Sequence, residues 1–224
     1  MPFLGLGVTV RRLLSLPERD PNADKTFDAR YGTETADVVH PEELGIDDAV
    51  AREGAVMYHP APARVTRYML RSLPGSPRDY TFVDIGAGKG RAALVASELP
   101  FKKVIGIEIS TSLWAIAKDN LSKYRSHRET GAPVEFTCAD ARTLRLPDGP
   151  VVLYMCHPFG TDILREVLGR IEDARRASPR PIAIFYLAPW DPVPQVFAET
   201  LPDFELAVDF REIGDLWNWQ LYTG

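Results

Sequence analysis

The chain has 224 residues, of which 45% are hydrophobic and 25% charged, and this length and composition suit one α/β domain that buries a full core. Its formal net charge is −5, whereas proteins that gain affinity by neutralising phosphates usually carry a clear excess of Lys and Arg. Nucleic acid is therefore a poor first candidate for a partner.

The first 79 residues mix proline and glycine with one helix-like segment at about 62–73. The apolar run 3–10 is too short to span a bilayer, and Arg11 and Arg12 follow it, where a secretory signal would place basic residues first. We expect a cytoplasmic protein without a membrane or export segment. Because residues 1–79 precede the first core strand, we interpret them as a helical cap of the same domain, over the sheet edge where ligands bind.

From residue 80 to residue 224, apolar strand-like runs alternate with helix-period segments, which predicts a doubly wound α/β core. Its mostly parallel strands are expected near 81–85, 103–107, 134–138, 150–155 and 181–187. Apolar residues recur at helical spacing over 113–124 and 163–171, which predicts two crossover helices.

Two further strand-like runs, 204–210 and 216–222, predict a closing antiparallel hairpin, which brings the sheet to seven strands. In the second run, Trp217, Trp219 and Leu221 share one face of a period-two strand. We interpret that face as a packed sheet surface and not as an aromatic ligand site.

Both cysteines, Cys138 and Cys156, lie at or near the ends of strand-like runs. They have no CxxC spacing and belong to no zinc-ligand cluster. We therefore predict two buried thiols in a reducing compartment and expect no metal.

The strand near 81–85 ends in Gly86-Ala87-Gly88-Lys89-Gly90 and opens into a helix. Glycines at such a turn let the backbone approach a ligand closely, because no side chain intervenes. A dinucleotide-binding GxGxxG fingerprint would need its third glycine at residue 91, where the chain has Arg91. The turn predicts a nucleotide-like ligand without matching that fingerprint.

Asp84 lies two residues before the first glycine, at the carboxyl end of the strand. A carboxylate there is unfavourable beside a pyrophosphate, but it can organise the turn and orient a cationic amino-acid ligand, directly or through water. That property suits the methionine part of S-adenosylmethionine. The alternative is an ordinary surface aspartate beside a glycine turn.

Two more acids follow the next two strands. Glu108 ends the second strand and can accept hydrogen bonds from both ribose hydroxyls, although a nicotinamide enzyme would place an acid similarly. A capping role for the helix that begins near Ser110 fits the same position. Asp140 lies just beyond the third strand and can accept the exocyclic amine of adenine, although alone it could be a solvated loop acid. The order of the three acids favours a nucleoside site.

With these residues in this order, the chain from Tyr80 to Gly224 resembles the class I, Rossmann-like S-adenosylmethionine-dependent methyltransferases. Residues 83–91 and 100–106 resemble more narrowly a group of small bacterial members of mostly unassigned substrate. The resemblance implies S-adenosylmethionine as methyl donor and S-adenosylhomocysteine as product. It also implies that Tyr58 of the cap reaches the cofactor's carboxylate; the alternative is a tyrosine that packs on the sheet edge. The cofactor-binding residues that it implies are Tyr58, Asp84, Gly86, Ala87, Gly88, Gly90, Glu108, Ile109, Asp140 and Ala141.

In this family the loop after the fourth strand faces the transferable methyl group, and here it is the segment 154–160, Tyr-Met-Cys-His-Pro-Phe-Gly. Amino-methylating relatives often carry Asn or Asp before Pro-Pro-aromatic, so His157 followed by a single proline puts amino-group specificity in doubt. His157 is the candidate base for an acceptor hydroxyl or amine, and a structural hydrogen-bonding role is the alternative. Pro158 favours an extended backbone at His157. The candidate acceptor-binding residues are Tyr31, Tyr154 and Phe159.

The leading hypothesis is an enzyme that methylates an oxygen or nitrogen of a small molecule, which the cap can enclose. Two alternatives stay open. One is a protein-lysine methyltransferase, and the other is a non-catalytic scaffold that binds S-adenosylmethionine without turnover. A nicotinamide oxidoreductase is a remote fourth, disfavoured by Asp84 and Arg91.

Overall fold

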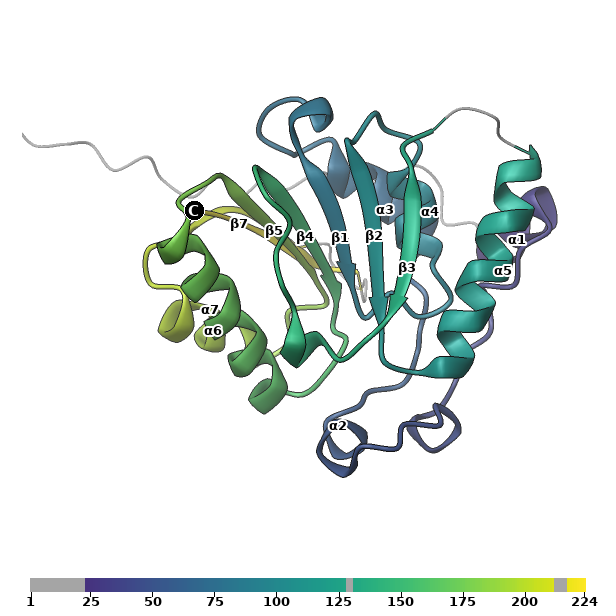
Figure 1. Cartoon of the computed structure of the whole chain (residues 1–224), viewed down its shortest axis with the longest axis horizontal. Helices are drawn as coiled ribbons and strands as arrows, with labels where there is room; N and C mark the ends of the chain where they lie inside the picture. Colours follow the sequence, from purple (N-terminus) through teal and green to yellow (C-terminus); the bar gives the residue numbers. More distant parts are fainter. Residues whose placement is uncertain (1–22, 128–130, 212–216) are drawn as a thin grey trace, which may run out of the picture.

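The computed structural model describes residues 23–127, 131–211 and 217–224 (Figure 1). The apolar run 3–10 and residue 216, where the last strand is expected to begin, lie outside the described residues. Seven strands form one sheet in the order β3-β2-β1-β4-β5-β7-β6. They are β1 (Thr81–Ile85), β2 (Lys103–Glu108), β3 (Val134–Cys138), β4 (Val151–Cys156), β5 (Ile182–Leu187), β6 (Glu205–Phe210) and β7 (Trp219–Thr223).

The strand order places the ligand edge of the sheet beside β1. Strands β1 to β5 pair in parallel, and β7 runs antiparallel to both β5 and β6. The chain proceeds from β1 to β2 and β3 on one side and returns to β4 on the other, so the winding direction reverses between β1 and β4. Ligands of such sheets bind at the carboxyl ends of the strands at this point. The predicted doubly wound sheet with a C-terminal hairpin is confirmed.

Helices cover both faces of the sheet (Figure 1). Helices α6 and α7 pack together on one side, whereas α3 and α4 pack together on the other, with α1 beside α5. Among the described residues, no helix is both long and apolar enough to cross a bilayer. The helices are α1 (Ala23–Tyr31), α2 (Ala49–Glu53), α3 (Ala63–Leu70), α4 (Arg91–Ala96), α5 (Thr111–His127), α6 (Thr161–Ala177) and α7 (Val193–Thr200).

Alternation along the strands divides the core between the two faces. In β1, Phe82 packs in a cluster with residues of α3 and α4, whereas Val83 and Ile85 pack with residues of α6 and α7. In β7, Trp219 and Leu221 are buried in the first cluster. The predicted face of the last strand is therefore a packed sheet surface.

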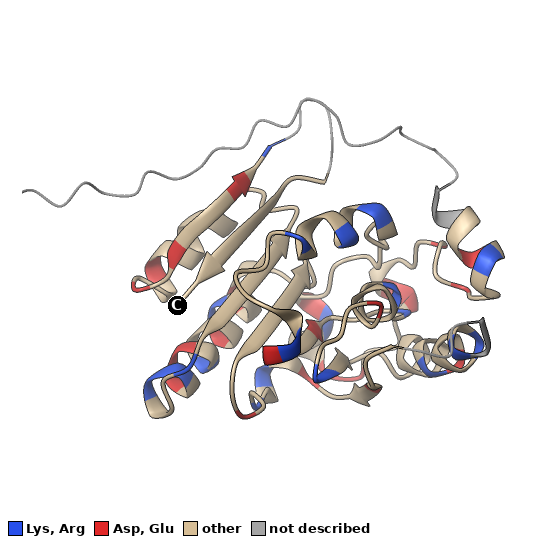
Figure 2. Cartoon of the chain, turned by 90° about the horizontal axis from the view of Figure 1, so that it is seen from above, with Lys and Arg blue, Asp and Glu red and all other residues tan. Residues whose placement is uncertain are grey.

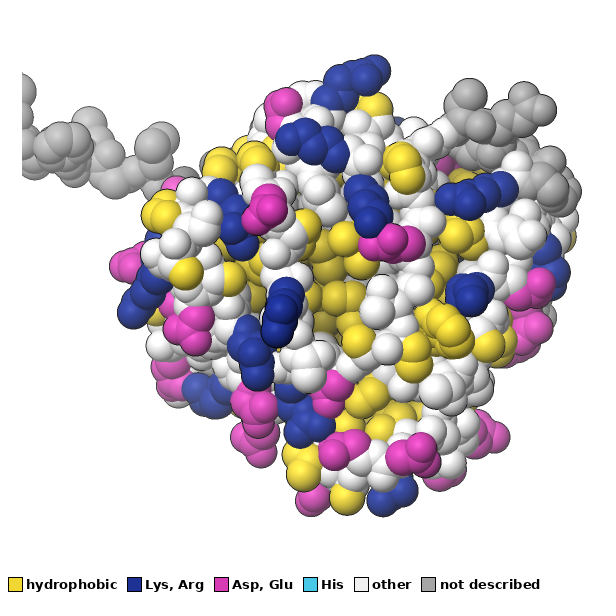
Figure 3. Space-filling view, viewed as in Figure 1, with side chains coloured by type: hydrophobic (Ala, Val, Ile, Leu, Met, Phe, Trp, Pro, Cys, Tyr) yellow, Lys and Arg dark blue, Asp and Glu magenta, His cyan; other side chains and the backbone are white. Residues whose placement is uncertain are grey.

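The connection from β3 to β4 departs from the alternation of strands and helices. Residues 139–150 contain only the short 3-10 helix η3 (Ala141–Thr143), and the side chains of Leu144 and Leu146 pack against the second core cluster from this loop. Figure 3, in the same view as Figure 1, shows hydrophobic side chains gathered in a hollow at the centre of the molecular surface that faces the viewer. In the view of Figure 2, basic and acidic residues are interspersed along the outer helices.

The N-terminal segment combines flanking helices with an irregular stretch. The helix predicted at 62–73 spans Ala63–Leu70 and packs on α4 rather than over the sheet edge. The stretch 37–61 lies at the carboxyl ends of the strands instead and contains α2 and the 3-10 helix η1 (Pro41–Glu43) (Figure 1). The part of the expected helical cap that covers the ligand edge is therefore mostly irregular backbone.

Candidate active site

A pocket opens at the carboxyl ends of β1, β2 and β4, beneath the stretch 44–61. All but two of the residues predicted to bind cofactor or acceptor line it, although they come from distant parts of the sequence. Those that line it are Tyr58, Asp84, Gly86, Ala87, Gly88, Glu108, Ile109, Asp140, Ala141, Tyr154, His157 and Phe159.

The two predicted residues outside the pocket have packing roles. Tyr31 lies in an aromatic cluster, with its ring centroid 4.9 Å from that of Phe27 and 4.5 Å from that of Tyr124. Gly90 precedes α4 with a φ of 89°, and a Cβ there would lie 2.6 Å from the ring of Phe136. The structure does not bring Tyr31 to the acceptor-facing wall.

The glycine turn needs glycine because of its backbone and its neighbours. Gly86 and Gly88 have φ values of 76° and 54°, which side chains rarely adopt. A Cβ at Gly86 would overlap Pro158, and a Cβ at Gly88 would overlap the ring of Tyr58. The sequence predicts close approach of a ligand to these glycines, whereas in this structure the groups that approach are protein side chains from the wall of the pocket.

Two buried carboxylates hold the turn in place. Asp84 accepts a 3.1 Å hydrogen bond from the N–H of Ala93 in α4, and Glu108 accepts bonds of 2.7 and 2.9 Å from the N–H groups of Gly88 and Ser110. Burial raises the pKa of both carboxyls, that of Asp84 to about 7 with a contribution from Glu108. A cationic ligand group beside them would stabilise their charged forms.

Asp140 is held by a neighbouring arginine. Its two oxygens accept bonds of 2.7, 2.9 and 2.6 Å from the N–H, Nε and Nη2 of Arg142, which also contacts Asp48 at 2.8 Å. Partial burial raises the pKa of Asp140, but the bonds from Arg142 outweigh it and the net pKa is lowered. A contact of Asp140 with adenine stays a prediction.

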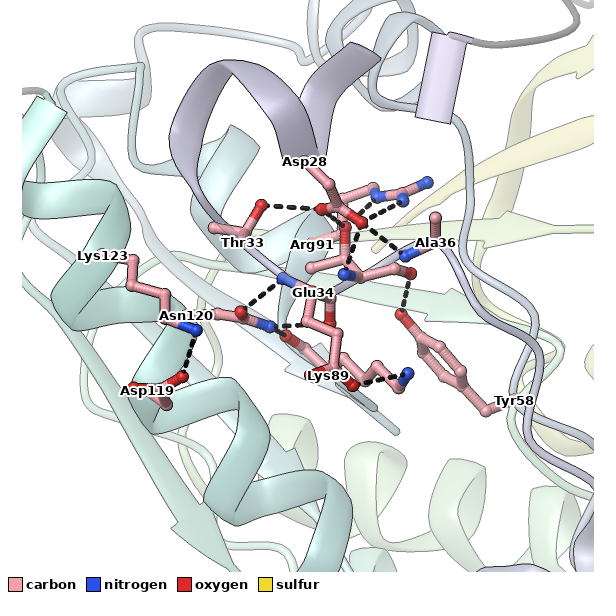
Figure 4. Close-up of polar contacts among 11 residues, drawn as sticks. Asp28, Thr33, Glu34, Ala36, Tyr58, Lys89, Arg91, Asp119, Asn120 and Lys123 are labelled. Atoms are coloured by element: carbon pink, nitrogen blue, oxygen red, sulfur yellow. Dashed lines mark hydrogen bonds and ion pairs between the residues drawn. The ribbon is translucent and has the colours of Figure 1, made fainter. Parts of the chain in front are cut away.

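A polar network anchors the N-terminal segment to the residue after the turn (Figure 4). The carboxylate of Asp28 accepts hydrogen bonds from the hydroxyls of Thr33 and Thr35 and from the N–H groups of Thr35 and Ala36. Arg91 donates from Nε to the hydroxyl of Thr35 at 2.7 Å, and its Nη2 lies 4.0 Å from Asp28. Arg91, noted in the sequence only as a missing glycine, thus joins α4 to the cap.

A buried amide extends this network to α5 (Figure 4). Asn120 accepts a 2.8 Å bond from the N–H of Glu34 and donates to the carbonyls of Glu34 and Lys89 at 3.1 and 3.0 Å. Sequence reasoning missed this residue. The available signal was a polar side chain on the same helical stripe as Ala117 and Tyr124, both of which are buried.

Tyr58 connects the cap to the glycine turn. Its hydroxyl donates a 2.9 Å hydrogen bond to the carbonyl of Thr35, and its backbone pairs with that of Val39. Lys89 lies with Nζ 5.7 Å from the centre of its ring. The hydroxyl is thus engaged within the cap, so the predicted contact with a cofactor carboxylate stays a prediction.

The loop after β4 has an unexpected backbone conformation. His157 has a φ of 41°, in the left-handed region, so the extended conformation predicted from Pro158 is wrong. Contacts with the cap hold this loop in place, since the N–H of Gly160 donates to the carbonyl of Gly54 at 2.9 Å. Nδ1 of His157 lies 3.2 Å from the hydroxyl of Tyr186, and burial lowers the pKa of the imidazole.

The other side chains of this strand and loop are mostly apolar in character. Tyr154 is fully buried, with its hydroxyl 3.4 Å from that of Thr66, and Phe159 is buried at the pocket. Burial raises the pKa of the Cys156 thiol to about 12, with Asp84 adding to the effect. Cys138 is exposed because its strand β3 lies at the edge of the sheet, and Cys156 is only partly buried, so the prediction of two buried thiols is wrong for Cys138 and holds only in part for Cys156.

Residues 82–176 match a family model described as a methyltransferase domain. No curated protein matches the sequence. Among the described residues, no group of three or more His, Cys, Asp or Glu side chains could hold a metal ion.

Solved structures show the same fold. Magnesium protoporphyrin IX methyltransferase from Synechocystis PCC 6803 with bound SAH has a TM-score of 0.50 and 15% identity over 92% of this chain and 95% of that chain. A predicted N6-adenine-specific DNA methylase from Listeria monocytogenes has a TM-score of 0.53 and 15% identity over 73% of this chain and 51% of that chain. Because a DNA methylase is among them, the comparisons do not support excluding nucleic acid.

Residues 82–176 thus form a methyltransferase domain, and the strand order and the glycine turn with its buried acids give the chain the fold of the class I, Rossmann-like methyltransferases. The resemblance read from the sequence is thereby confirmed, and the methyl acceptor is the remaining question.

Proposed function

We propose that the protein transfers the methyl group of S-adenosylmethionine to an oxygen or nitrogen of a small molecule. A lone pair of the acceptor attacks the methyl carbon as the carbon–sulfur bond breaks, and the bonding pair stays on sulfur, which gives S-adenosylhomocysteine. An acceptor that carries a proton on the methylated atom releases that proton. The sulfonium already activates the methyl group, so the protein's main task is to align the acceptor and exclude water.

The core side of the pocket suits the cofactor. Asp84 and Glu108 are buried carboxylates with raised pKa values, and the positive charge of the methionyl part would stabilise their ionised forms. We assign Asp84 to the amino-acid part, Glu108 to the ribose and Asp140 to the adenine, with Gly86 and Gly88 supplying the turn. These assignments rest on the positions of the residues at the carboxyl ends of β1 to β3.

The composition of the pocket wall on the cap side supports a small, largely apolar acceptor. Charged lining residues all come from the core side, namely Asp84, Arg91, Glu108 and Asp140. The lining residues that the cap contributes carry no Lys, Arg, Asp or Glu; they are Leu44, Ile46, Ala51, Ala55, Val56, Met57, Tyr58, His59, Pro60 and Ala61.

A cationic lysine side chain is a poor fit for this wall. Removing an ammonium from water without a partner costs several kcal/mol, and the cap wall offers no carboxylate to offset that cost. The backbone hydrogen bond from Gly160 to Gly54 also holds the cap against the core, which favours an enclosed site over an open peptide groove.

Transfer of a labelled methyl group tests the proposal. The protein is incubated with methyl-labelled S-adenosylmethionine and a cell extract separated into small-molecule, protein and nucleic-acid fractions. We expect label in the small-molecule fraction. Label confined to protein or to nucleic acid would overturn the choice of acceptor, and S-adenosylhomocysteine binding without label in any fraction would indicate a scaffold.

His157 is the residue that we place against the acceptor from the loop after β4. Replacing it with Ala should lower the rate of labelling at least tenfold while S-adenosylhomocysteine affinity changes little. Full turnover of the Ala variant at neutral and mildly acidic pH would remove His157 from the reaction. Gln195→Ala, on the exposed side of α7, is the matched control and should keep full activity.

A further inference from the structure

The hydroxyl of Tyr186 contacts the imidazole of His157 in a buried setting. Tyr186 lies in β5, beside β4, and its side chain is fully buried. The two atoms in contact are the phenolic oxygen and Nδ1, 3.2 Å apart. Because Nδ1 is engaged, Nε2 is the ring nitrogen of His157 that is available to a ligand in the pocket.

Hydrogen-bond accounting distinguishes the two neutral tautomers of His157. If Nδ1 carried the proton, it would donate to the phenolic oxygen, and the phenolic proton would need a second acceptor. Within the described part of the chain, the hydroxyl of Tyr186 has one hydrogen-bond partner, His157, and no second acceptor for its proton is present. A buried donor without an acceptor is destabilising, because it has lost its hydrogen bond to water and gained none in the protein. If Tyr186 instead donates to Nδ1, both groups are satisfied and Nε2 carries the proton.

Two further observations fit a fixed, neutral ring. The ring of Trp190 meets that of His157 edge-on at 4.8 Å, so the imidazole is held by contacts on more than one side. Burial lowers the pKa of His157 below its ordinary value, and no charged group contributes to that shift, so the neutral form prevails at neutral pH.

We infer that Tyr186 is a positioning residue that fixes His157 as the Nε2–H tautomer, so that His157 meets the acceptor as a hydrogen-bond donor and not as a base. The acceptor must then present a lone pair to Nε2–H, as a carbonyl, carboxylate or hydroxyl oxygen does. This role toward the acceptor rests on the proposed function, whereas the tautomer itself does not.

The tautomer can be measured directly by NMR. The full-length protein is labelled with 15N-histidine, and long-range 1H–15N spectra are recorded at about pH 8, above the ordinary histidine pKa of about 6.5. The sequence has four histidines, and the signals of His157 are those that disappear in His157→Gln. We expect a single tautomer for His157, protonated at Nε2, and a mixed tautomer population in Tyr186→Phe.

Tyr222→Phe provides the matched control, because Tyr222 also has a buried hydroxyl in the sheet but donates it to Gln220 at 2.6 Å. This variant should leave the His157 spectrum unchanged. A wild-type ring protonated at Nδ1, or one that is unchanged in folded Tyr186→Phe, would overturn the inference. Neither result would affect methyl transfer as the proposed reaction, which is judged by S-adenosylhomocysteine binding and methyl labelling.

Discussion

The ring of Tyr58 packs directly on the backbone of Gly88, in the space that a side chain at residue 88 would occupy. Its hydroxyl reaches in the other direction, to the carbonyl of Thr35 at 2.9 Å. The cap and the glycine turn are thus packed together as one unit. A substitution in either the cap or the turn should therefore change the affinity of the cofactor site.

Gly88→Ala should disrupt this unit. The new methyl group overlaps Tyr58, and the φ of 54° costs about 1–2 kcal/mol for an alanine. We expect the variant to lose at least tenfold in S-adenosylhomocysteine affinity, measured by calorimetry. Gly149→Ala is the control, because Gly149 has a φ of 77° with nothing within 4 Å of a Cβ. It should lose stability of the same order but keep its affinity, and equal affinity in both variants would contradict the packing argument.

Tyr58→Ala and Tyr58→Phe separate the ring from the hydroxyl. Ala removes the group that covers Gly88, whereas Phe removes only the hydrogen bond to Thr35. We expect Ala to weaken S-adenosylhomocysteine binding severalfold more than Phe does, with both affinities measured by calorimetry. If Tyr58→Phe binds S-adenosylhomocysteine as weakly as Tyr58→Ala does, the hydroxyl and not the ring contributes to affinity. A contact between the hydroxyl and the cofactor's carboxylate would give that result.

Asp84 should make the free protein less stable as the pH rises. Its pKa is raised from 3.8 to about 7 in the folded state, so between these values the folded protein holds a proton that the unfolded chain has lost. Stability therefore falls between about pH 4 and pH 7, by an amount on the order of a few kcal/mol from this group. In urea unfolding over that range, Asp84→Asn should lack this loss. A parallel pH dependence in wild type and variant would show that Asp84 is not the cause.

Glu172 should have the opposite pH dependence. Hydrogen bonds from Arg175 and Arg176 lower its pKa from 4.5 to about 2, so its contribution is present above pH 4.5 and is lost as the pH falls through 2. Glu172→Gln should cost about 1 kcal/mol of unfolding free energy at pH 7 and progressively less below pH 4.5. A difference from wild type that is constant with pH would indicate lost packing rather than lost charge.

The parts of the molecule that local sequence determines were predictable. Strand ends, the hairpin and the glycine turn follow from alternation and from residues that adopt positive φ, and Asp84 and Glu108 could be located because each ends a strand. Their place in one pocket then follows from the parallel sheet, since the carboxyl ends of its strands meet at one edge.

Features set by tertiary contacts were not predictable in this way. The backbone of His157 is left-handed although proline follows it, and its partner Tyr186 lies on another strand. Tyr31 was a candidate acceptor-binding residue, yet α1 places it against Tyr124. No local pattern reports that Asn120 joins α5 to the cap, because that contact exists only once the segments are packed.

Calorimetry with S-adenosylhomocysteine tests the central claim most directly. We predict binding of one molecule per chain, weakened at least tenfold, or about 1.4 kcal/mol, in Glu108→Gln, with no comparable binding of NAD. Tight NAD binding together with no response to S-adenosylhomocysteine would contradict the assignment of this pocket to the methyl donor.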